Sequence, residues 1–116
     1  MVTYTVLYSR DIVEYLDAKG TSIFAGWFDE LDAQAAAKVT VALQRIRQGN
    51  LSNAKGVGAG VFEYRIDFGP GYRVYFGKDG EHIVVLLGGG TKRRQDRDIG
   101  LAQARWADYR RRKKGT

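Results

Sequence analysis

The sequence predicts an α+β domain in which helices pack on an antiparallel sheet. Two stretches with apolar residues at helical spacing, 21–31 and 32–50, come before three strand-like segments between residues 61 and 87. Another helical stretch begins near Arg94, and no internal repeat or linker divides the chain. We therefore expect all 116 residues to form a single domain with two N-terminal helices and one C-terminal helix.

Two segments near the start of the chain have the composition of strands. Val2–Tyr8 is rich in valine, threonine and tyrosine and is predicted to form the first strand. β-Branched and aromatic residues also favour a strand at Ile12–Leu16, where a short helix is the competing interpretation.

Each predicted N-terminal helix has a capping residue at its start. Thr21 or Ser22 can cap the first helix and Asp32 the second, because their side-chain oxygens accept hydrogen bonds from free backbone N–H groups. Gly49 and Asn50 end the second helix. The apolar residues at helical spacing are expected to be buried: Ile23, Phe24, Trp27, Phe28 and Leu31, then Val39, Leu43 and Ile46.

After a glycine-rich loop at 51–60, the apolar pattern changes from helical spacing to alternation. The strand Val61–Asp67 has an apolar face of Phe62, Tyr64 and Ile66 and a polar face of Glu63, Arg65 and Asp67. A turn at 68–71 leads into a second strand, Tyr72–Phe76, and a hairpin turn at 77–80 follows that strand.

The last predicted strand, His82–Leu87, is almost continuously apolar. Such a run is typical of a central strand that is covered on both faces. Three glycines, Gly88–Gly90, are expected to end this strand before the C-terminal helix. That helix carries Ile99, Ala102, Trp106 and Tyr109 on one side, so we expect Trp106, like Trp27, to lie in the core.

Composition limits the classes of function that are open to the chain. Without cysteine and with one histidine, His82, it lacks the residues for a disulfide scaffold, a thiolate metal site or a multi-histidine zinc site. No apolar run approaches the roughly 20 residues of a membrane span. The first residues lack the basic and apolar regions of a signal peptide. We therefore expect a cytoplasmic protein that binds no metal ion and does not enter a membrane.

Positive charge gathers in the second half of the chain. Nineteen Lys and Arg residues against thirteen Asp and Glu give a net charge of +6, and this excess lies after residue 60. This distribution predicts an anionic partner: nucleic acid, an anionic membrane surface or an acidic protein. The tail Arg110–Lys114 is either a contact with nucleic acid or a solvated helix end. Ordinary solubility charge is the alternative interpretation of the whole excess.

Some of these cations flank the predicted strands and are expected to converge at one end of the sheet. They are Arg65, Arg73, Lys92, Arg93 and Arg94. The guanidinium fork matches phosphate oxygens, and fixed cations stabilise charge that develops on phosphorus, so a convergent group suits a phosphodiester. The alternative is a set of solvated charges paired with nearby acids: Glu63, Asp67, Asp96 and Asp98.

Other residues give weaker signals for function. The glycines form neither a dinucleotide-binding fingerprint nor a P-loop, so they indicate tight turns. Tyr64, Tyr72 and Tyr75 alternate with arginines and suit stacking on unpaired bases, but tyrosines of a half-buried sheet are more often core. His82 has the chemistry of a general acid or base, but a lone histidine at a strand edge is more often a surface residue.

Two stretches of the sequence resemble the RelE/ParE toxin superfamily, and more closely its HigB-like "addiction module killer" branch. They are Phe62–Phe76, which ends in Gly-Tyr-Arg-Val-Tyr-Phe, and Leu86–Ile99, which contains Gly-Gly-Gly-Thr-Lys-Arg-Arg. The likeness continues upstream through Phe24–Phe28 and Arg45–Asn50, so that it spans roughly residues 12 to 110. The Gly-Tyr-Arg-Val-Tyr-Phe run is its most specific part.

The resemblance implies a RelE-like fold and the toxin of a type II toxin–antitoxin pair. Relatives of this kind cut mRNA on the ribosome without a metal or other cofactor, by attack of a ribose 2′-OH on its own 3′ phosphate. The implied partners are the ribosome, mRNA and a helix-turn-helix antitoxin protein, with which the toxin forms an oligomer. Carried over by position, Arg73, Lys92 and Arg93 are the expected catalytic residues. Arg65, Arg94 and Tyr72 are the expected RNA-binding residues.

The sequence departs from RelE proper at two positions. Glu63 stands where RelE has a second lysine, and Ile99 stands where it has a tyrosine that serves in acid–base chemistry. Asp96, His82 and Tyr72 are the alternatives for that role. The departures leave open two other functions, a ParE-like toxin that inhibits DNA gyrase and a nucleic-acid-binding module without catalysis.

Overall fold

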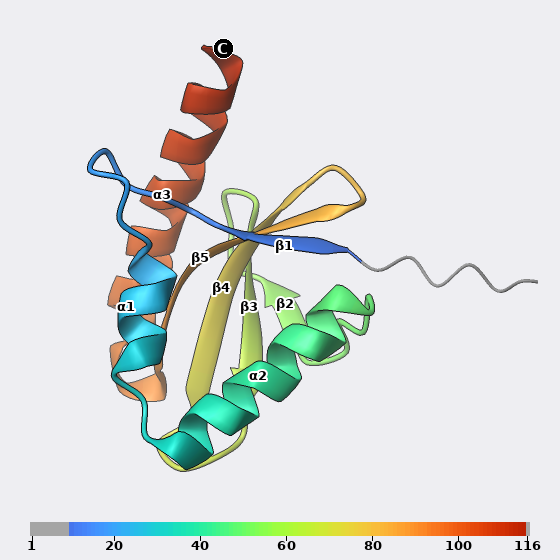
Figure 1. Ribbon diagram of the computed structural model, residues 1–116, viewed down its shortest axis with the longest axis vertical. Coiled ribbons are helices and arrows are strands. Elements are labelled where there is room, and N and C mark those ends of the chain that lie inside the picture. Colours follow the sequence, from blue (N-terminus) through green and yellow to red (C-terminus); the bar gives the residue numbers. More distant parts are fainter. Residues whose placement is uncertain (1–9, 116) are drawn as a thin grey trace, which may run out of the picture.

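The computed structural model describes residues 10–115, which form a five-stranded sheet and three α-helices (Figure 1). In chain order the elements are β1 Asp11–Glu14, α1 Ile23–Asp29, α2 Ala33–Arg47, β2 Ala54–Gly56, β3 Val61–Ile66, β4 Tyr72–Asp79, β5 Ile83–Thr91, the 3₁₀ turn η1 Lys92–Arg94 and α3 Gln95–Lys114. The strand order across the sheet is β1-β5-β4-β3-β2. The predicted α+β class, with two N-terminal helices and one C-terminal helix, is confirmed.

The sheet is antiparallel except at one edge, where β1 runs parallel to β5. A parallel pair needs a long connection. Here every element from α1 to β4 lies between the two strands in the sequence. The strand predicted at Ile12–Leu16 is present as β1, and the strand predicted at Val2–Tyr8 lies outside the described residues.

The two predicted helix caps are confirmed. The Ser22 hydroxyl accepts a hydrogen bond of 3.0 Å from the backbone N–H of Ala25 at the start of α1. The Asp32 carboxylate accepts one of 2.8 Å from the N–H of Ala35 at the start of α2. These contacts satisfy N–H groups that have no partner inside the helices, so they fix where each helix begins.

The strand boundaries differ from the prediction in three places. The predicted loop at 51–60 contains the short strand β2, which pairs with β3. β4 continues through the predicted turn at 77–80 as far as Asp79. β5 continues through the glycines at 88–90, which do not end it. The pairing of β4 with β5, from Asp79 and Ile83 to Tyr72 and Thr91, holds these glycines in the sheet.

Gly89 lets a helix approach β5 closely. A Cβ atom at this position would lie 2.3 Å from Cε3 of Trp27 on α1, which is well inside van der Waals contact. We predict that Gly89→Ala lowers the free energy of unfolding by about 1–3 kcal/mol, because the indole ring must move. Gly26→Ala is the matched control, since nothing lies within 4 Å of a Cβ there and alanine favours a helix. Urea unfolding of both variants measures the effect, and equal stabilities would contradict it.

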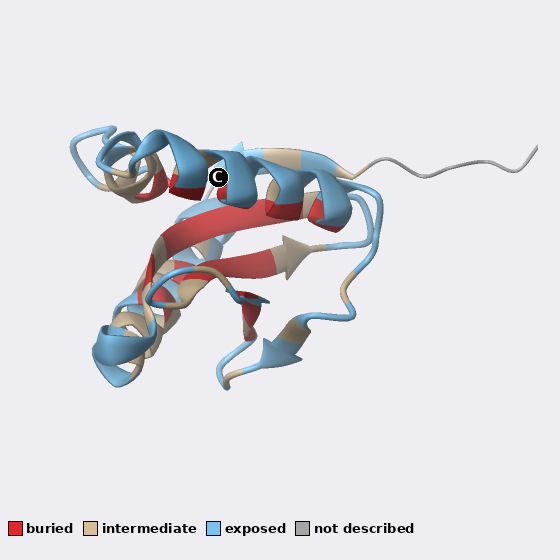
Figure 2. Ribbon diagram, turned by 90° about the horizontal axis from the view of Figure 1, so that it is seen from below, coloured by how far each residue is buried: buried red, intermediate tan, exposed pale blue. Residues whose placement is uncertain are grey.

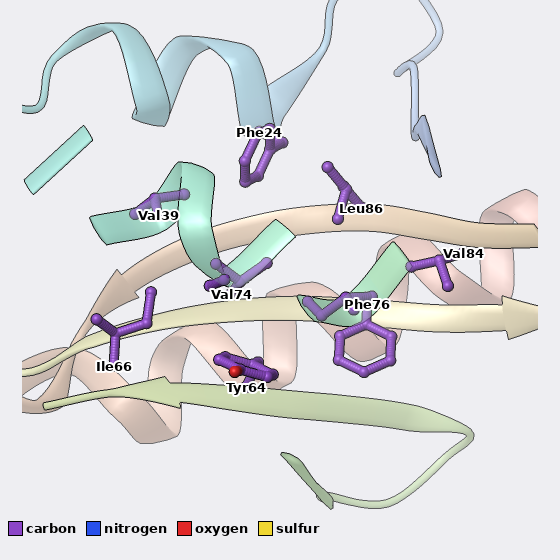
Figure 3. Close-up of a cluster of buried hydrophobic side chains, with 10 residues drawn as sticks. Phe24, Val39, Tyr64, Ile66, Val74, Phe76, Val84 and Leu86 are labelled. Atoms are coloured by element: carbon purple, nitrogen blue, oxygen red, sulfur yellow. The ribbon is translucent and has the colours of Figure 1, made fainter. Parts of the chain in front are cut away.

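Apolar cores lie on both faces of the sheet. Figure 2 shows the buried positions concentrated in the central strands and on the sides of the helices that face them. The core under α1 and α2 is drawn in Figure 3 and includes Phe24, Val39, Tyr64, Ile66, Val74, Phe76, Val84 and Leu86. The core under α3 includes Tyr15, Val61, Tyr75, Val85, Leu87, Ala102 and Trp106. The alternation along β5 confirms that it is a central strand covered on both faces.

Contacts to two carboxylates, one at the end of β4 and one on α3, hold the C-terminal half of α3 against the rest of the domain. Asp79 at the end of β4 accepts a hydrogen bond of 2.8 Å from the Tyr109 hydroxyl and forms an ion pair with Lys113. The Tyr15 hydroxyl donates to Asp108 of α3 at 2.7 Å. Hydrogen bonds from Lys113 and then Tyr109 hold the pKa of the Asp79 carboxyl below its ordinary value of 3.8.

The lowered pKa of Asp79 predicts a pH-dependent contribution to stability. A carboxyl group whose pKa is lower in the folded chain stabilises it above pH 3.8, and this contribution disappears as the pH falls through the folded-state pKa. We expect Asp79→Asn to lower the free energy of unfolding by about 0.5 kcal/mol at neutral pH and by less at acid pH. Urea unfolding of the variant and the wild type at several pH values measures this, and a difference that does not change with pH would contradict it.

Candidate functional site

Three of the predicted cations lie together at the end of the sheet where β4 begins. Arg65 on β3 and Arg73 on β4 are directly opposed in the antiparallel register. The backbone N–H of Lys92 donates a hydrogen bond of 2.9 Å to the carbonyl oxygen of Gly71. A Cβ atom on Gly71 would lie 3.5 Å from both Nη1 of Arg73 and Cβ of Lys92. We call Arg65, Arg73 and Lys92 the basic cluster.

A buried carboxylate, Glu63, holds the two arginines of this cluster. Its Oε1 atom lies 3.4 Å from Nε of Arg65 and 3.4 Å from Nε of Arg73. The Tyr75 hydroxyl donates to Oε2 at 3.2 Å, and the Gln95 amide donates to both carboxylate oxygens at 3.1 and 3.0 Å. Glu63 lies on the predicted polar face of its strand and pairs with Arg65 and Arg73, as the alternative interpretation of these charges expects, but the carboxylate is 0% exposed and not solvated. The reason is Gln95, the first residue of α3, which contacts the carboxylate on that face of β3.

The two arginines differ in exposure. The side chain of Arg73 is only 7% exposed, whereas that of Arg65 is 48% exposed. An isolated buried charge is strongly unfavourable, so Arg73 depends on the Glu63 carboxylate for its place in the structure. Burial, and then the negative charge of Glu63, raise the pKa of the Tyr75 hydroxyl, which keeps it protonated and able to donate. The result is a guanidinium fixed in one position beside cations that reach the solvent.

The other predicted cations follow Lys92 in η1 and are exposed. Arg94 lines a groove between α1 and α3, which we call the α1–α3 groove; its other lining residues are Trp27, Gly89, Gly90, Thr91, Arg97, Asp98 and Leu101. Arg93 lies between Lys92 and Arg94 in the same turn. The cations predicted to converge are therefore divided between the basic cluster, the exposed turn η1 and the α1–α3 groove.

The predicted aromatic site residue lies on the opposite face of the sheet from the basic cluster. Tyr72 is half-buried, with its ring centroid 6.5 Å from those of Trp27 and Phe68, on the side that α1 and α2 cover. Tyr72 and Arg73 are neighbours on one strand, so their side chains point to opposite faces. The other two tyrosines are core residues: Tyr64 is 2% exposed and Tyr75 is 1% exposed.

Of the three alternatives for acid–base chemistry, none is in contact with the basic cluster. His82 lies in the hairpin loop between Asp79 and Ile83. This loop joins β4 to β5 at the end of the sheet opposite the basic cluster. Asp96 is exposed in the first turn of α3, and Tyr72 faces the other side of the sheet.

Asp98 is a further titratable residue near these cations, one that the sequence offered only as the partner of a solvated charge. A Cβ atom on Gly90 would lie 2.0 Å from Oδ2 of Asp98. The Asp98 carboxylate therefore lies directly against β5. Gly90 is opposed to Arg73 in the register of β4 and β5. Burial raises the pKa of the Asp98 carboxyl, while the positive charges of Arg97, Arg94 and Arg105 act in the other direction. Gly90 is the feature of the sequence that could have indicated this contact, because a glycine opposite Arg73 leaves space for a side chain from α3.

Comparison with known proteins places this chain within a family. Residues 26–107 match the family model described as "Phage derived protein Gp49-like (DUF891)", and that match covers more than half of the chain. The chain belongs to the Gp49-like family. This family is associated with toxin–antitoxin modules. The chain is also 40% identical over 89 residues to a protein of Haemophilus influenzae described as "Uncharacterized protein", a match that covers 76% of this chain and 90% of the relative.

The matched part of the Gp49-like chain contains the whole basic cluster, Glu63 and Asp98. Within residues 10–115, no group of three or more His, Cys, Asp or Glu side chains is arranged to hold a metal ion. In the part of the chain that the structure describes, no helix has both the length and the apolar character to cross a membrane. The site offers fixed and exposed cations with the carboxylates of Glu63 and Asp98 beside them.

Proposed function

We propose that this Gp49-like protein is the toxin of a toxin–antitoxin pair and that it cleaves mRNA on the ribosome as an endoribonuclease. The observation that carries the proposal is the basic cluster, in which a buried carboxylate fixes Arg73 beside the exposed Lys92. The association of the family with toxin–antitoxin modules supports the toxin assignment. The resemblance of the sequence around Arg73 and Lys92 to RelE-like toxins supports the choice of RNA as substrate.

In the proposed reaction, a ribose 2′-OH attacks the adjacent 3′ phosphate and the bond from phosphorus to the 5′ oxygen breaks. Negative charge grows on the phosphate oxygens during this step, and cations that are already fixed in place stabilise it without reorganising. Arg73 and Arg93 contact the scissile phosphate in this account, with Lys92 beside them. Arg65 and Arg94 hold the neighbouring backbone. Tyr72 faces the other side of the sheet from Arg73, so in this account it stacks on an RNA base away from the scissile phosphate, where its half-buried ring reaches solvent.

The reaction also needs a group that accepts the proton of the 2′-OH and a group that protonates the 5′ oxygen. Asp98 suits one of these roles, because burial raises its pKa and its carboxylate lies against Gly90, opposite Arg73 in the sheet. No metal ion or other cofactor takes part in the proposed step. The partners in this proposal are the ribosome, mRNA and a helix-turn-helix antitoxin that forms an oligomer with the toxin in the cytoplasm.

Primer extension on a defined mRNA tests this proposal. Purified wild-type protein is incubated with the mRNA in the presence and in the absence of ribosomes. We expect discrete cuts that require ribosomes and that become weaker in Lys92→Ala. Lys38→Ala on α2 is the matched control, because Lys38 is an exposed lysine on the other side of the sheet. No cuts from folded wild-type protein would overturn the endoribonuclease proposal.

A second candidate is a toxin that binds DNA gyrase and does not cut RNA. Two observations favour a toxin without catalysis. Glu63 compensates the charge of Arg73, and Ile99 stands where RelE has the tyrosine that serves in acid–base chemistry. A supercoiling assay with DNA gyrase, run beside primer extension, separates the two candidates. A gyrase inhibitor traps cleaved DNA complexes and leaves ribosome-bound mRNA intact.

A further inference from the structure

A second groove lies far along α3 from the basic cluster. It has a volume of about 1050 Å³ and runs between the C-terminal half of α3 and the ends of β3 and β4. Phe62, Trp106 and Ala107 contribute apolar surface to it. The glycines Gly60 and Gly80 also line it and leave it open. We call it the helix–hairpin groove. In Figure 1 the end of α3 extends beyond the sheet on this side.

The helix–hairpin groove is strongly positive. Five cations line it: Lys78, Arg110, Arg111, Lys113 and Lys114. The one carboxylate among the lining residues, Asp79, is occupied by Lys113 and Tyr109. Arg110 and Lys114 form no ion pair with any residue between 10 and 115. An occupant that carries negative charge therefore complements the groove.

The aromatic rings of this groove do not suit the stacking of nucleic-acid bases. Stacking needs a ring face that is open to solvent. Trp106 is only 6% exposed, and its ring is stacked on Tyr109 with centroids 5.4 Å apart. Phe62 is stacked on Phe76 at 5.5 Å, and the Lys78 ammonium lies 4.5 Å from the Phe62 centroid. The apolar surface is therefore suited to an inserted aliphatic side chain rather than to a base.

We infer that the helix–hairpin groove binds an acidic polypeptide segment that inserts an apolar side chain between α3 and the strand ends. Carboxylates of that segment pair with Arg110, Lys114 and Lys78, and its apolar side chain packs near Ala107 and Trp106. The inference rests on the proposed function in one respect: it takes the antitoxin as the protein that supplies this segment. The family match ends at residue 107, so most of the basic residues around this groove lie outside the part shared with the family model.

Fluorescence anisotropy with the full chain tests this inference. The probe is a short fluorescein-labelled peptide rich in glutamate and leucine, compared with a peptide in which serine replaces every leucine. We expect the leucine-containing peptide to bind the wild type and Ala107→Glu to weaken that binding about tenfold, through steric block and repulsion. Ala104→Glu is the matched control: Ala104 is an exposed alanine one turn earlier on α3 that does not line the groove. We expect this variant to bind like the wild type.

Equal binding by the wild type and Ala107→Glu would overturn the inference, and so would equal binding of the two peptides. An RNA strand of matched charge that binds the wild type more tightly than the peptide, and that Ala107→Glu weakens, would assign the groove to nucleic acid instead. Primer extension keeps this result separate from the proposed function. If peptide binding follows the expected pattern while wild-type protein cuts no mRNA, the groove stands and the endoribonuclease proposal fails.

Discussion

Replacement of Glu63 by alanine is expected to lower the free energy of unfolding by about 3–5 kcal/mol. The carboxylate is fully buried and is the charge that compensates Arg73, whose side chain is only 7% exposed. Its removal leaves a buried guanidinium without a counter-ion, and it leaves Tyr75 and Gln95 without the acceptor of their hydrogen bonds. Unfolding in urea, followed by circular dichroism, measures the change.

Two further variants make this prediction specific. Asp67→Ala removes an exposed acid just after the same strand and should change the stability by about 0.5 kcal/mol or less. The double variant Glu63→Leu/Arg73→Met replaces both charges with apolar side chains and should recover the part of the loss that comes from the unpaired guanidinium. Tyr75 and Gln95 still lack their acceptor in this variant, so its stability should lie between that of Glu63→Ala and that of the wild type. A loss of less than about 1 kcal/mol in Glu63→Ala would contradict the view that this ion pair is structural.

The conservative variant Arg73→Lys is expected to cut ribosome-bound mRNA about a hundredfold more slowly than the wild type. Lysine keeps the positive charge beside Glu63, so the chain should still fold. It loses the planar guanidinium fork, whose Nε atom lies 3.4 Å from Glu63 and whose other nitrogens are the ones that would contact the phosphate in the proposed reaction. The rate of cleavage under single-turnover conditions is the appropriate measurement, because it reports the chemical step and not product release.

Arg45→Lys provides the control for this variant. Arg45 is exposed in the last turn of α2, and the same substitution there should leave the cleavage rate unchanged. If Arg73→Lys cuts as fast as the wild type, Arg73 acts only as a structural partner of Glu63, and the cleavage site lies elsewhere.

Local patterns in the sequence predicted most of the fold because they depend on neighbouring residues. The caps Ser22 and Asp32 act within one helical turn, and the alternation of Val61–Asp67 records one face of a strand. The parallel pairing of β1 with β5 depends on residues that are far apart in the sequence, and no local pattern encodes it. The glycines at 88–90 were predicted to end the strand, whereas they make room for Trp27 and Asp98 against β5. That packing is also a long-range contact, so no local pattern encodes it.

The candidate site shows the same division. The meeting of Arg65, Arg73 and Lys92 was predictable, because an antiparallel meander places these positions at one end of the sheet. The burial of Glu63 was not, because it depends on Gln95, which lies 32 residues later in the chain. The position of Tyr72 away from the arginines was available from the sequence, since adjacent residues of a strand point to opposite faces.

Primer extension on ribosome-bound mRNA with the double variant Glu63→Leu/Arg73→Met tests the central proposal most directly. This variant is designed to keep the fold while removing the arginine that the proposed reaction uses. Circular dichroism and urea unfolding establish first that it is folded. We expect a folded protein that makes no ribosome-dependent cuts where the wild type makes them. Cuts at the wild-type rate would contradict the assignment of RNA cleavage to the basic cluster.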